Sequence, residues 1–468
     1  MLYSVKKVHL IGIGGIGMSG IAELLKNKEF VVSGSDIADS PNVQRLIDLG
    51  IKVSIGHNKE NISDAELVIY SDAIPKDNAE LKEALAKNII VYSRARMISE
   101  IAKLNNSTVA IAGTHGKTTT TSMVGTILKA MNLDPTIIVG GVVKSLESNS
   151  VLGGGDTFVV EADEYNKSLL HLSPTIAVIN NIDFEHIECY NDIDDLKDTF
   201  LQFANSVPFY GTVCACKDSN NVASILSKID KPIITYGIES QNVDIKAENL
   251  HQENGTISFD VKVKDQIFSV NLSVPGKYNA YNALAALSVC ETMGIDLESA
   301  CKALSNFSGV KRRFDIKANK DIMIIDDYAH HPVEVQNVIE TVKSNWNKNL
   351  NVIFQPHLFS RTKEFYKDFA KALMIADNVM ITEIFGSREK EDNSITSDLI
   401  INEMLKLNHK NVSYVSSKDI VEEVKSRGVK GDIFLTMGAG NIWRYAEAVS
   451  YTHLRAHETK ANLVCRLL

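Results

Sequence analysis

The chain has 468 residues, a length that favours two to four domains over a single one. Hydrophobic residues make up 44% of it and charged residues 23%, which are ordinary globular values and exclude a collagen-like or wholly disordered chain. The 58 acidic residues outnumber the 49 basic ones, and the net charge of -9 excludes a general nucleic-acid binder, which needs a basic field. Local basic pockets for phosphate groups are compatible with this balance.

The six cysteines are sparse and form no CxxC pair. This spacing predicts neither a disulfide framework nor a zinc knuckle, and it favours buried free thiols in a reducing compartment. A metal clamp by Cys214 and Cys216 is the alternative, but no second pair lies nearby. The cysteines are Cys189, Cys214, Cys216, Cys290, Cys301 and Cys465.

The apolar run over 8–16 follows Lys6 and Lys7 and is superficially similar to a signal peptide. His9 interrupts the run, and glycines recur within it. No stretch of the chain reaches the roughly 20 apolar residues that a membrane span requires. We therefore expect a soluble, cytoplasmic protein without a membrane partner.

The first part of the chain alternates between strand and helix patterns, with a glycine turn after the first strand. This succession is typical of a doubly wound parallel sheet. Because the segment 103–107 is polar and turn-forming, we expect a Rossmann-like domain over 1–105. Strands are expected over 7–13, 30–36, 67–70 and 89–92, and helices over 18–27, 41–49 and 79–87.

A second strand, glycine turn and helix begin after this boundary and predict a central ATPase domain of the P-loop type over 106–309. Its sheet is expected to be mostly parallel, with strands over 108–112, 157–160 and 175–180 and a helix from residue 117. The stretch 231–274 alternates in short runs, which predicts small antiparallel hairpins at the side of this domain. A helix rich in alanine is expected over 281–293.

A third alternating unit predicts a C-terminal Rossmann-like domain over 310–449. Its strands are expected over 322–325, 351–354, 378–381 and 432–436. The predicted fold is therefore α/β with three domains. The tail 450–468 does not continue this pattern, and we assign it no function.

The first glycine turn, Gly12-Ile-Gly-Gly-Ile-Gly17, fits the pattern GxGxxG. Glycines permit a tight turn and let backbone amides approach a pyrophosphate at a helix N-terminus. Asp36 ends the second strand, where an acid that binds a ribose is expected. The motif indicates a dinucleotide such as NAD or another diphosphate such as a UDP-sugar, and it does not separate the two.

The second glycine turn, Gly113-Thr-His-Gly-Lys117, is more specific because it carries a lysine at the start of a helix. The strict spacing GxxxxGK[ST] is not met, since Ile111 stands where the first glycine belongs. Backbone amides can still cradle phosphates, Lys117 can reach the β- and γ-phosphates, and a following threonine hydroxyl can hold Mg²⁺. A second nucleotide site indicates that ATP drives a reaction on a diphosphate-containing substrate.

Acidic residues follow two strands of the central domain. Glu161, Asp163 and Glu164 stand at the end of one strand, and Asp183, Glu185 and His186 follow another. Carboxylates beside a phosphate loop are the oxygen ligands that Mg²⁺ prefers, and a histidine can complete the shell. The sequence therefore predicts a magnesium site at this edge.

These blocks together resemble the Mur ligases, ATP-dependent enzymes that form amide bonds in peptidoglycan. The similarity runs from about residue 5 to 449, and its blocks include GIGGIGMSGIAE, AGTHGKTTTTSM, VPGKYNAYNALAAL, GVKRRFD, IDDYAHHPVEV and FQPHLFSRTKEFYKDF. Within the family the chain is most similar to the ligases that add L-alanine to UDP-N-acetylmuramate. The resemblance thus implies these two substrates, with ATP and Mg²⁺ as cofactors.

The resemblance also implies site residues. The UDP-sugar would bind at Gly14, Gly15, Ile16, Gly17, Asp36 and Ser71. ATP would bind at Gly113, Thr114, His115, Gly116, Lys117, Thr118, Thr119, Asn279, Asn282, Arg313 and Asp326. Asn279 and Asn282 match the family's HNxxN motif, in which this chain has Tyr278 instead of the histidine.

The implied magnesium ligands are Thr118, Glu161 and His186. The third domain would close over the site and hold the amino acid with His330, His357 and Arg361. Lys197 lies where related ligases carry a carbamylated lysine, and we assign it no such modification. The residues implied in catalysis are Lys117, Glu161, His186, Arg313 and His331.

By this resemblance, ATP would convert the lactyl carboxylate of the muramoyl group to an acyl phosphate, which the amine of L-alanine then attacks. A monomer or weak homodimer without a nucleic-acid partner is expected. One alternative is the ligase of cell-wall recycling, which attaches a tripeptide to the same sugar nucleotide. An NAD-dependent oxidoreductase that uses the first glycine turn is the alternative of a different class.

Overall fold

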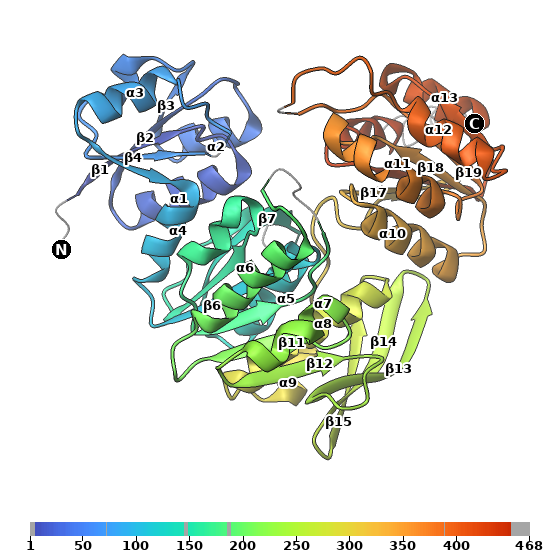
Figure 1. The fold of residues 1–468 in the computed structure, drawn as a ribbon, viewed down its shortest axis with the longest axis horizontal. Coiled ribbons are helices and arrows are strands. Elements are labelled where there is room, and N and C mark those ends of the chain that lie inside the picture. Colours follow the sequence, from blue (N-terminus) through green and yellow to red (C-terminus); the bar gives the residue numbers. More distant parts are fainter. Residues whose placement is uncertain (1–4, 72, 145–147, 185–188, 388, 451–468) are drawn as a thin grey trace, which may run out of the picture. The chain divides into compact units, whose positions relative to one another are not determined.

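The computed structural model describes residues 5–450 apart from 72, 145–147, 185–188 and 388. The chain divides into two compact units, one of residues 1–250, 258–272 and 278–308, and one of residues 251–257, 273–277 and 309–468 (Figure 1). Among the helices of the described chain, none combines the length and the apolar content that a bilayer crossing requires.

The N-terminal sheet of the described chain is parallel and has the strand order β3-β2-β1-β4-β5. The chain runs outward from β1 to β3 and then crosses back to β4, so the direction of winding reverses between β1 and β4. Ligands of doubly wound sheets bind outside the carboxyl ends of the strands at such a reversal. The strands are β1 (Lys7–Ile11), β2 (Val31–Asp36), β3 (Lys52–Ile55), β4 (Leu67–Tyr70) and β5 (Ile90–Ser93).

Three of the four α-helices described in this part begin after a side chain that accepts a hydrogen bond from a free backbone amide; α1, which follows Gly15, has no such cap. The Ser40 side chain accepts a hydrogen bond from the Val43 amide before a helix whose first residue is Pro41, and Asn78 caps the next helix in the same way. The helices are α1 (Ile16–Asn27), α2 (Pro41–Asp48), α3 (Ala79–Ala86) and α4 (Arg94–Ala102), with the 3₁₀ helix η1 (Lys59–Ile62) (Figure 1).

The central sheet has the strand order β15-β14-β13-β12-β11-β10-β6-β9-β7-β8. Its middle strands are apolar because they are covered on both faces; every residue over 109–112 is fully buried. The strands are β6 (Ser107–Ala112), β7 (Thr136–Val143), β8 (Ser148–Val151), β9 (Thr157–Ala162), β10 (Ile176–Ile179), β11 (Thr212–Cys216), β12 (Ile233–Gly237), β13 (Ile245–Glu253), β14 (Thr256–Val263) and β15 (Gln266–Leu272).

The segment 231–274 forms β12 to β15 at one edge of this sheet, and two-residue turns join β13 to β14 and β14 to β15, as expected for the predicted hairpins. One expectation for this region needs correction. The alanine-rich helix starts at Lys277 instead of residue 281, so Asn279 and Asn282 lie in its first turns. The helices are α5 (Lys117–Ala130), α6 (Ile193–Asn205), α7 (Asn220–Ile225), α8 (Lys277–Thr292) and α9 (Leu297–Leu304), with η2 (Tyr165–His171) and η3 (Leu226–Lys228).

The C-terminal sheet has the order β16-β17-β21-β18-β19-β20 and is parallel except for its edge strand β16, which runs antiparallel to β17. The strands are β16 (Asp315–Asn319), β17 (Met323–Asp327), β18 (Leu350–Phe354), β19 (Asn378–Ile381), β20 (Val412–Tyr414) and β21 (Ile433–Met437). The helices are α10 (Pro332–Asn345), α11 (Phe359–Leu373), α12 (Asp398–Lys406) and α13 (Ile420–Arg427), with η4 (Ser417–Asp419). The predicted α/β class with mostly parallel sheets and some antiparallel strands is confirmed.

Candidate active site

The first glycine turn lies between the carboxyl ends of β1 and β4, where the winding of the first sheet reverses. Gly12 takes a positive φ of 78°, and a β-carbon there would lie 3.3 Å from the Cβ of Ser71. The backbone amides of Gly12 and Ile13 both donate to the Ser35 carbonyl at the end of β2. The turn is thus fixed by neighbouring strands before any ligand binds, and its helix α1 begins at Ile16 behind it.

Asp36 and Arg94 place charges of opposite sign beside this turn. A carboxylate oxygen of Asp36 accepts the Gly14 amide at 2.8 Å. Arg94 of α4 lies against Gly17, where a β-carbon would be 2.8 Å from its Nη1. The guanidinium also lies 3.7 Å from the carboxylate of Asp163, which follows β9 in the central sheet. Arg94 is a cation that motif reading missed, because it comes from a helix distant in sequence.

A buried carboxylate binds the strand residue Ser35, whose carbonyl accepts the amides of the first turn. Glu80 is fully buried, and its oxygens accept hydrogen bonds from Ser35 Oγ at 2.6 Å and Asn61 Nδ2 at 2.6 Å. His9 Nε2 lies 3.2 Å from the same carboxylate. Burial alone would raise the pKa of Glu80, but these hydrogen bonds outweigh it and lower the pKa. The network connects β1, β2, η1 and α3 under the turn.

The second glycine turn lies between two strands that each end in polar residues. Residue 161 of β9 is paired with residue 111 of β6, two positions before the turn, and the Asn180 amide after β10 donates to the Ala112 carbonyl. The strand order β10-β6-β9 therefore brings the ends of all three strands to one edge of the sheet. The acids after β9 and the polar residues after β10 flank the turn, as the sequence predicted.

The segment after β10 holds the start of this turn through hydrogen bonds. The His115 amide donates to Asn181 Oδ1 at 2.7 Å, and the Thr114 amide donates to the Asn181 carbonyl at 3.2 Å. The Thr114 hydroxyl donates to the Asp183 carbonyl and accepts the Asp183 amide. Because two amides are engaged in this way, the amides around Gly116 and the start of α5 are better placed to meet phosphates.

A chain of buried polar side chains packs behind the turn. The Tyr236 hydroxyl donates to Asn180 Oδ1 at 2.9 Å, Asn180 Nδ2 donates to the Thr120 hydroxyl at 3.0 Å, and that hydroxyl donates to Asn282 Oδ1 at 3.2 Å. All four side chains are at least nine-tenths buried. Gly116 has a φ of 82°, and a β-carbon there would lie 2.4 Å from Asn282 Oδ1. Only glycine fits this position.

The predicted nucleotide residues Asn279 and Asn282 are therefore part of the support of the turn. Both are buried on α8, and Asn282 Nδ2 donates to Asn279 Oδ1 at 3.2 Å. Sequence reasoning missed Asn180, Thr120 and Tyr236, which complete the same network. A tyrosine on a strand far along the chain gives no motif signal, so only the fold reveals its role.

Lys117 opens α5 and directs its ammonium group back into the turn. The ammonium donates to the carbonyls of Gly113 at 2.5 Å and Thr114 at 3.1 Å, and it forms an ion pair with Glu164 at 2.8 Å. Thr118 and Thr119 follow in the first turn of α5 with buried side chains. The predicted phosphate-binding residues thus share one loop.

The residues described at the predicted magnesium site offer oxygen atoms. Glu161 Oε1 accepts the Gly140 amide at 2.6 Å, and a β-carbon at that glycine would lie 3.0 Å from Glu161 Oε2. Mg²⁺ in proteins is usually bound by only one or two carboxylates, and waters and phosphates complete its coordination shell. The Glu161 carboxylate and the Thr118 hydroxyl are therefore suitable types of ligand for this ion. No cluster of three acidic, histidine or cysteine side chains suited to a metal occurs among the described residues. Glu185 and His186 lie outside them.

The second unit contains the remaining predicted residues. Asp326 and Asp327 end β17 and are buried. Burial raises the pKa of Asp327 to about 6, while the nearby charge of Arg313 acts to lower it. Burial also raises the pKa of Asp326, against the attraction of Arg312. Arg312, which the prediction did not include, donates to the carbonyls of Gly438 and Gly440 after β21.

Three of the predicted closure residues lie together within this unit. The rings of His330 and His357 are 5.8 Å apart, and Arg361 Nη1 lies 3.2 Å from His357 Nδ1. Arg313 lies 3.6 Å from the Glu334 carboxylate, which also pairs with His330 at 3.3 Å. His331 is the N-cap residue of α10, and its buried ring contacts the Phe365 ring with 5.3 Å between centroids.

Two minor expectations concern Lys197 and the cysteines. Lys197 on α6 forms an ion pair with Asp194 at 3.2 Å. Four of the five described cysteines, Cys214, Cys216, Cys290 and Cys301, are buried thiols, whereas Cys189 is only half-buried. Burial raises the pKa of Cys214 to about 11 and that of Cys216 to about 12, which does not favour their use as metal ligands.

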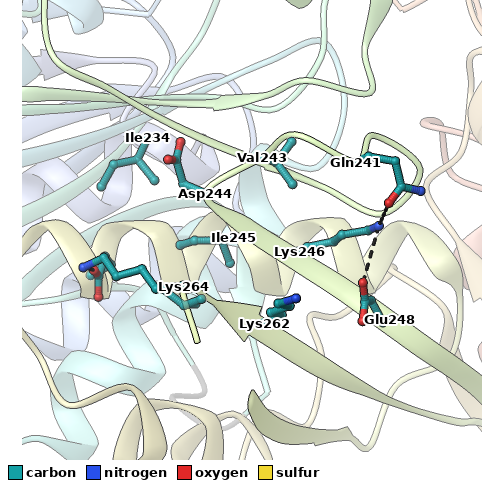
Figure 2. Close-up of a pocket in the computed structure, with 11 residues that line it drawn as sticks. Ile234, Gln241, Val243, Asp244, Ile245, Lys246, Glu248, Lys262 and Lys264 are labelled. Atoms are coloured by element: carbon teal, nitrogen blue, oxygen red, sulfur yellow. Dashed lines mark hydrogen bonds and ion pairs between the residues drawn. The ribbon is translucent and has the colours of Figure 1, made fainter. Parts of the chain in front are cut away.

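A groove of about 530 Å³ lies beside β13, β14 and α8 and contains none of the predicted site residues (Figure 2). Two of its three lysines are neutralised by neighbours: Lys246 lies between Gln241 at 2.6 Å and Glu248 at 3.4 Å, and Lys264 pairs with Glu291 at 3.2 Å. Since acids balance the lysines along its wall, we assign no ligand to this groove.

Two glycine turns at sheet edges, one with a lysine-bearing phosphate loop and flanking acids, define a nucleotide-dependent α/β enzyme. Three domain models of one family match the chain in order: the Mur ligase family catalytic domain over 7–106, the Mur ligase middle domain over 111–290, and the Mur ligase glutamate ligase domain over 312–440. The chain belongs to the Mur ligase family.

Relatives with curated names agree over nearly the whole chain. The UDP-N-acetylmuramate–L-alanine ligase of Geotalea uraniireducens is 42% identical over 96% of this chain and 98% of its own, and that of Clostridium tetani is 42% identical over 94% and 97%. Among solved structures, the UDP-N-acetylmuramate–alanine ligase of Thermotoga maritima has a TM-score of 0.81 at 30% identity and covers 96% of this chain and 99% of its own. A murein peptide ligase of Psychrobacter arcticus, at 24% identity and a TM-score of 0.72, shares the fold.

Proposed function

We propose that the chain joins L-alanine to the lactyl carboxylate of UDP-N-acetylmuramate at the expense of ATP, in peptidoglycan synthesis. The observation that carries the proposal is the near-complete, end-to-end similarity to relatives named for this reaction. The lysine-bearing phosphate loop flanked by acids supports the use of ATP. The first glycine turn, with the N-terminus of α1 that follows it and the nearby Arg94, suits the diphosphate of the sugar nucleotide.

The chemistry follows from charge. A carboxylate is a poor electrophile, so the γ-phosphoryl group of ATP is first transferred to it to give an acyl phosphate and ADP. Lys117 and the amides at the start of α5 stabilise negative charge on that phosphoryl group. The amine of L-alanine then attacks the carbonyl carbon, the tetrahedral intermediate expels phosphate, and the amine loses its proton.

Mg²⁺ belongs to this proposal as an ion that would neutralise negative charge on the phosphates of ATP. Thr118 and Glu161 would hold it, with His186 as the third ligand that the resemblance implies. The residues of the second unit, Arg313 and the group of His330, His357 and Arg361, would bind nucleotide phosphates and the amino acid. The reaction is assigned to the cytoplasm, where ATP is available.

The test is release of phosphate from ATP by the full chain with UDP-N-acetylmuramate, Mg²⁺ and one amino compound at a time. We expect release with L-alanine and formation of the UDP-N-acetylmuramoyl-alanine product by mass spectrometry. Release with the tripeptide of cell-wall recycling but not with L-alanine would reassign the chain to the recycling ligase. Tight binding of NADH without binding of the UDP-sugar would favour the oxidoreductase.

A further inference from the structure

Glu164 lies at the phosphate loop; it is one of the acids that predicted a magnesium site at this edge, but the resemblance implies no role for it. Only 1% of its side chain is exposed, and both carboxylate oxygens are within hydrogen-bond distance of Lys117 Nζ, at 2.8 and 3.1 Å. A buried carboxylate is costly unless it is paired, so this ion pair fixes both partners. The loop lysine is therefore held by an anion of the protein itself.

The hydrogen bonds of the ammonium group show what this pairing means for a ligand. A lysine ammonium has three N–H donors. The acceptors within hydrogen-bond distance of this ammonium include the carbonyls of Gly113 and Thr114 and the carboxylate of Glu164. A phosphate group that binds Lys117 must compete with these acceptors, and among them Glu164 carries the negative charge that repels it.

The position of Glu164 is set by a strained turn. Asn166 and Lys167 both adopt left-handed backbone angles (φ 52°, ψ 30° and φ 56°, ψ 26°), which are costly for residues other than glycine. The Glu164 carbonyl accepts the Lys167 amide at 2.9 Å and the Tyr190 hydroxyl at 2.5 Å. Lys167 Nζ is in turn bound to Asp195 of α6 at 2.6 Å. Several contacts thus maintain this turn against its strain.

From this geometry we propose that Glu164 is a positioning residue that holds Lys117 in the loop and competes with the phosphates of ATP for its ammonium group. The inference rests on the proposed function, because it takes ATP as the ligand of the loop. Glu164 keeps the lysine oriented and charge-balanced when no nucleotide is present. Each binding event exchanges the carboxylate for a phosphate, and this exchange weakens the affinity for ATP.

The test compares ATP binding by the full-length wild type, Glu164→Gln and Glu164→Asp, measured by calorimetry with ATP and Mg²⁺. Glutamine keeps the shape and an acceptor but removes the charge, so we expect the Kd for ATP to fall roughly five- to tenfold. Aspartate withdraws the carboxylate by one methylene and should lower the Kd by a smaller factor. Glu100→Gln, at an exposed acid paired with Lys103, is the matched control and should leave the Kd unchanged.

A second measurement does not depend on the nucleotide. Acylation of Lys117 by an amine-reactive ester, followed by mass spectrometry, should be several-fold faster in Glu164→Gln than in the wild type, because its ammonium loses the negative charge that stabilises it. A Kd for ATP that is unchanged or higher in both variants would overturn the proposal. A wild-type chain that binds no ATP would instead overturn the proposed function, whereas altered ATP binding without ligation of L-alanine would leave this inference standing.

Discussion

The two glycine turns both follow a buried strand and lead into a helix, but they receive their charges in different ways. In the first turn the cation is Arg94, which comes from a helix far along the chain, and the acid Asp36 binds a turn amide. In the second turn Lys117 belongs to the loop and is balanced by Glu164. The spacing of glycines therefore predicts the backbone shape of a phosphate site. The charged side chains around that site depend on the surrounding fold.

Both turns are also supported from beneath by buried polar networks, and these differ in kind. An ionisable group, Glu80, is at the centre of the first network. The second network consists of the neutral side chains of Tyr236, Asn180, Thr120 and Asn282. We therefore expect the first support to weaken at acidic pH, where Glu80 becomes protonated, and the second support to be insensitive to the same change in pH.

The largest effect should come from Lys117→Ala, which removes the charge of the second turn alone. Stabilisation of the transferring phosphoryl group is lost, so kcat/KM for ligation should fall by about 10²- to 10³-fold or more. Binding of the UDP-sugar, measured by calorimetry, should be retained. A variant that ligates at the wild-type rate would contradict the assignment of this loop to ATP.

Gly14→Ala should damage the first turn and spare the second. The new β-carbon would lie 2.7 Å from Val43 Cγ2 and 3.0 Å from Asp36 Oδ2, so both the start of α2 and the acid beside the turn must shift. We expect affinity for the UDP-sugar to fall about tenfold or more, with the Kd for ATP unchanged as the internal control. Equal loss of both affinities would mean that the two turns do not act separately.

Tyr236→Phe tests the neutral network behind the second turn. The substitution removes the hydroxyl that donates a hydrogen bond to the buried Asn180 Oδ1. The loss should lower the free energy of unfolding by about 1–2 kcal/mol. The Kd for ATP should rise two- to fivefold, roughly, because the turn is held less firmly, and UDP-sugar binding should not change. Tyr414→Phe, at an exposed tyrosine, is the control. A stability loss without any change in ATP binding would assign Tyr236 a purely structural role.

Glu80→Gln should show the smallest effect on binding and a distinct effect on pH dependence. The pKa of Glu80 is lowered in the folded state, so its stabilisation is fully present above the unfolded pKa of about 4.5 and is lost as the pH falls through the lower folded value. Urea unfolding between pH 6 and pH 3 should therefore lose stability less steeply in the variant. Parallel curves for the variant and the wild type would contradict a charged Glu80.

The local sequence pattern predicted the bounds of strands correctly where a short run of apolar residues is buried. The strands over 67–70 and 378–381 were predicted at their observed bounds, because short apolar runs between polar turns have few alternatives. The start of α8 was placed too late, since polar residues open that helix and their burial depends on contacts from distant segments. The domain boundaries at 105 and 309 stay predictions.

The site was predicted in outline and not in its interactions. Gly113 to Thr119 could be assigned because a loop, a lysine and a helix start are contiguous in sequence. Asn181 contacts His115 across 66 positions, and Tyr236 reaches Asn180 across 56, so no local pattern could reveal either. Glu164 was visible as an acid near the loop, but its pairing with Lys117 depends on the register of β9 beside β6.

The engaged amides of Thr114 and His115 bear on how the products leave. A small free anion that enters this loop finds two of its backbone donors already occupied and its lysine already balanced. Such a loop retains inorganic phosphate weakly, since affinity for a nucleotide must also come from contacts to its base and sugar. Turnover would then not be slowed by the phosphate that each cycle releases, even where that ion is abundant.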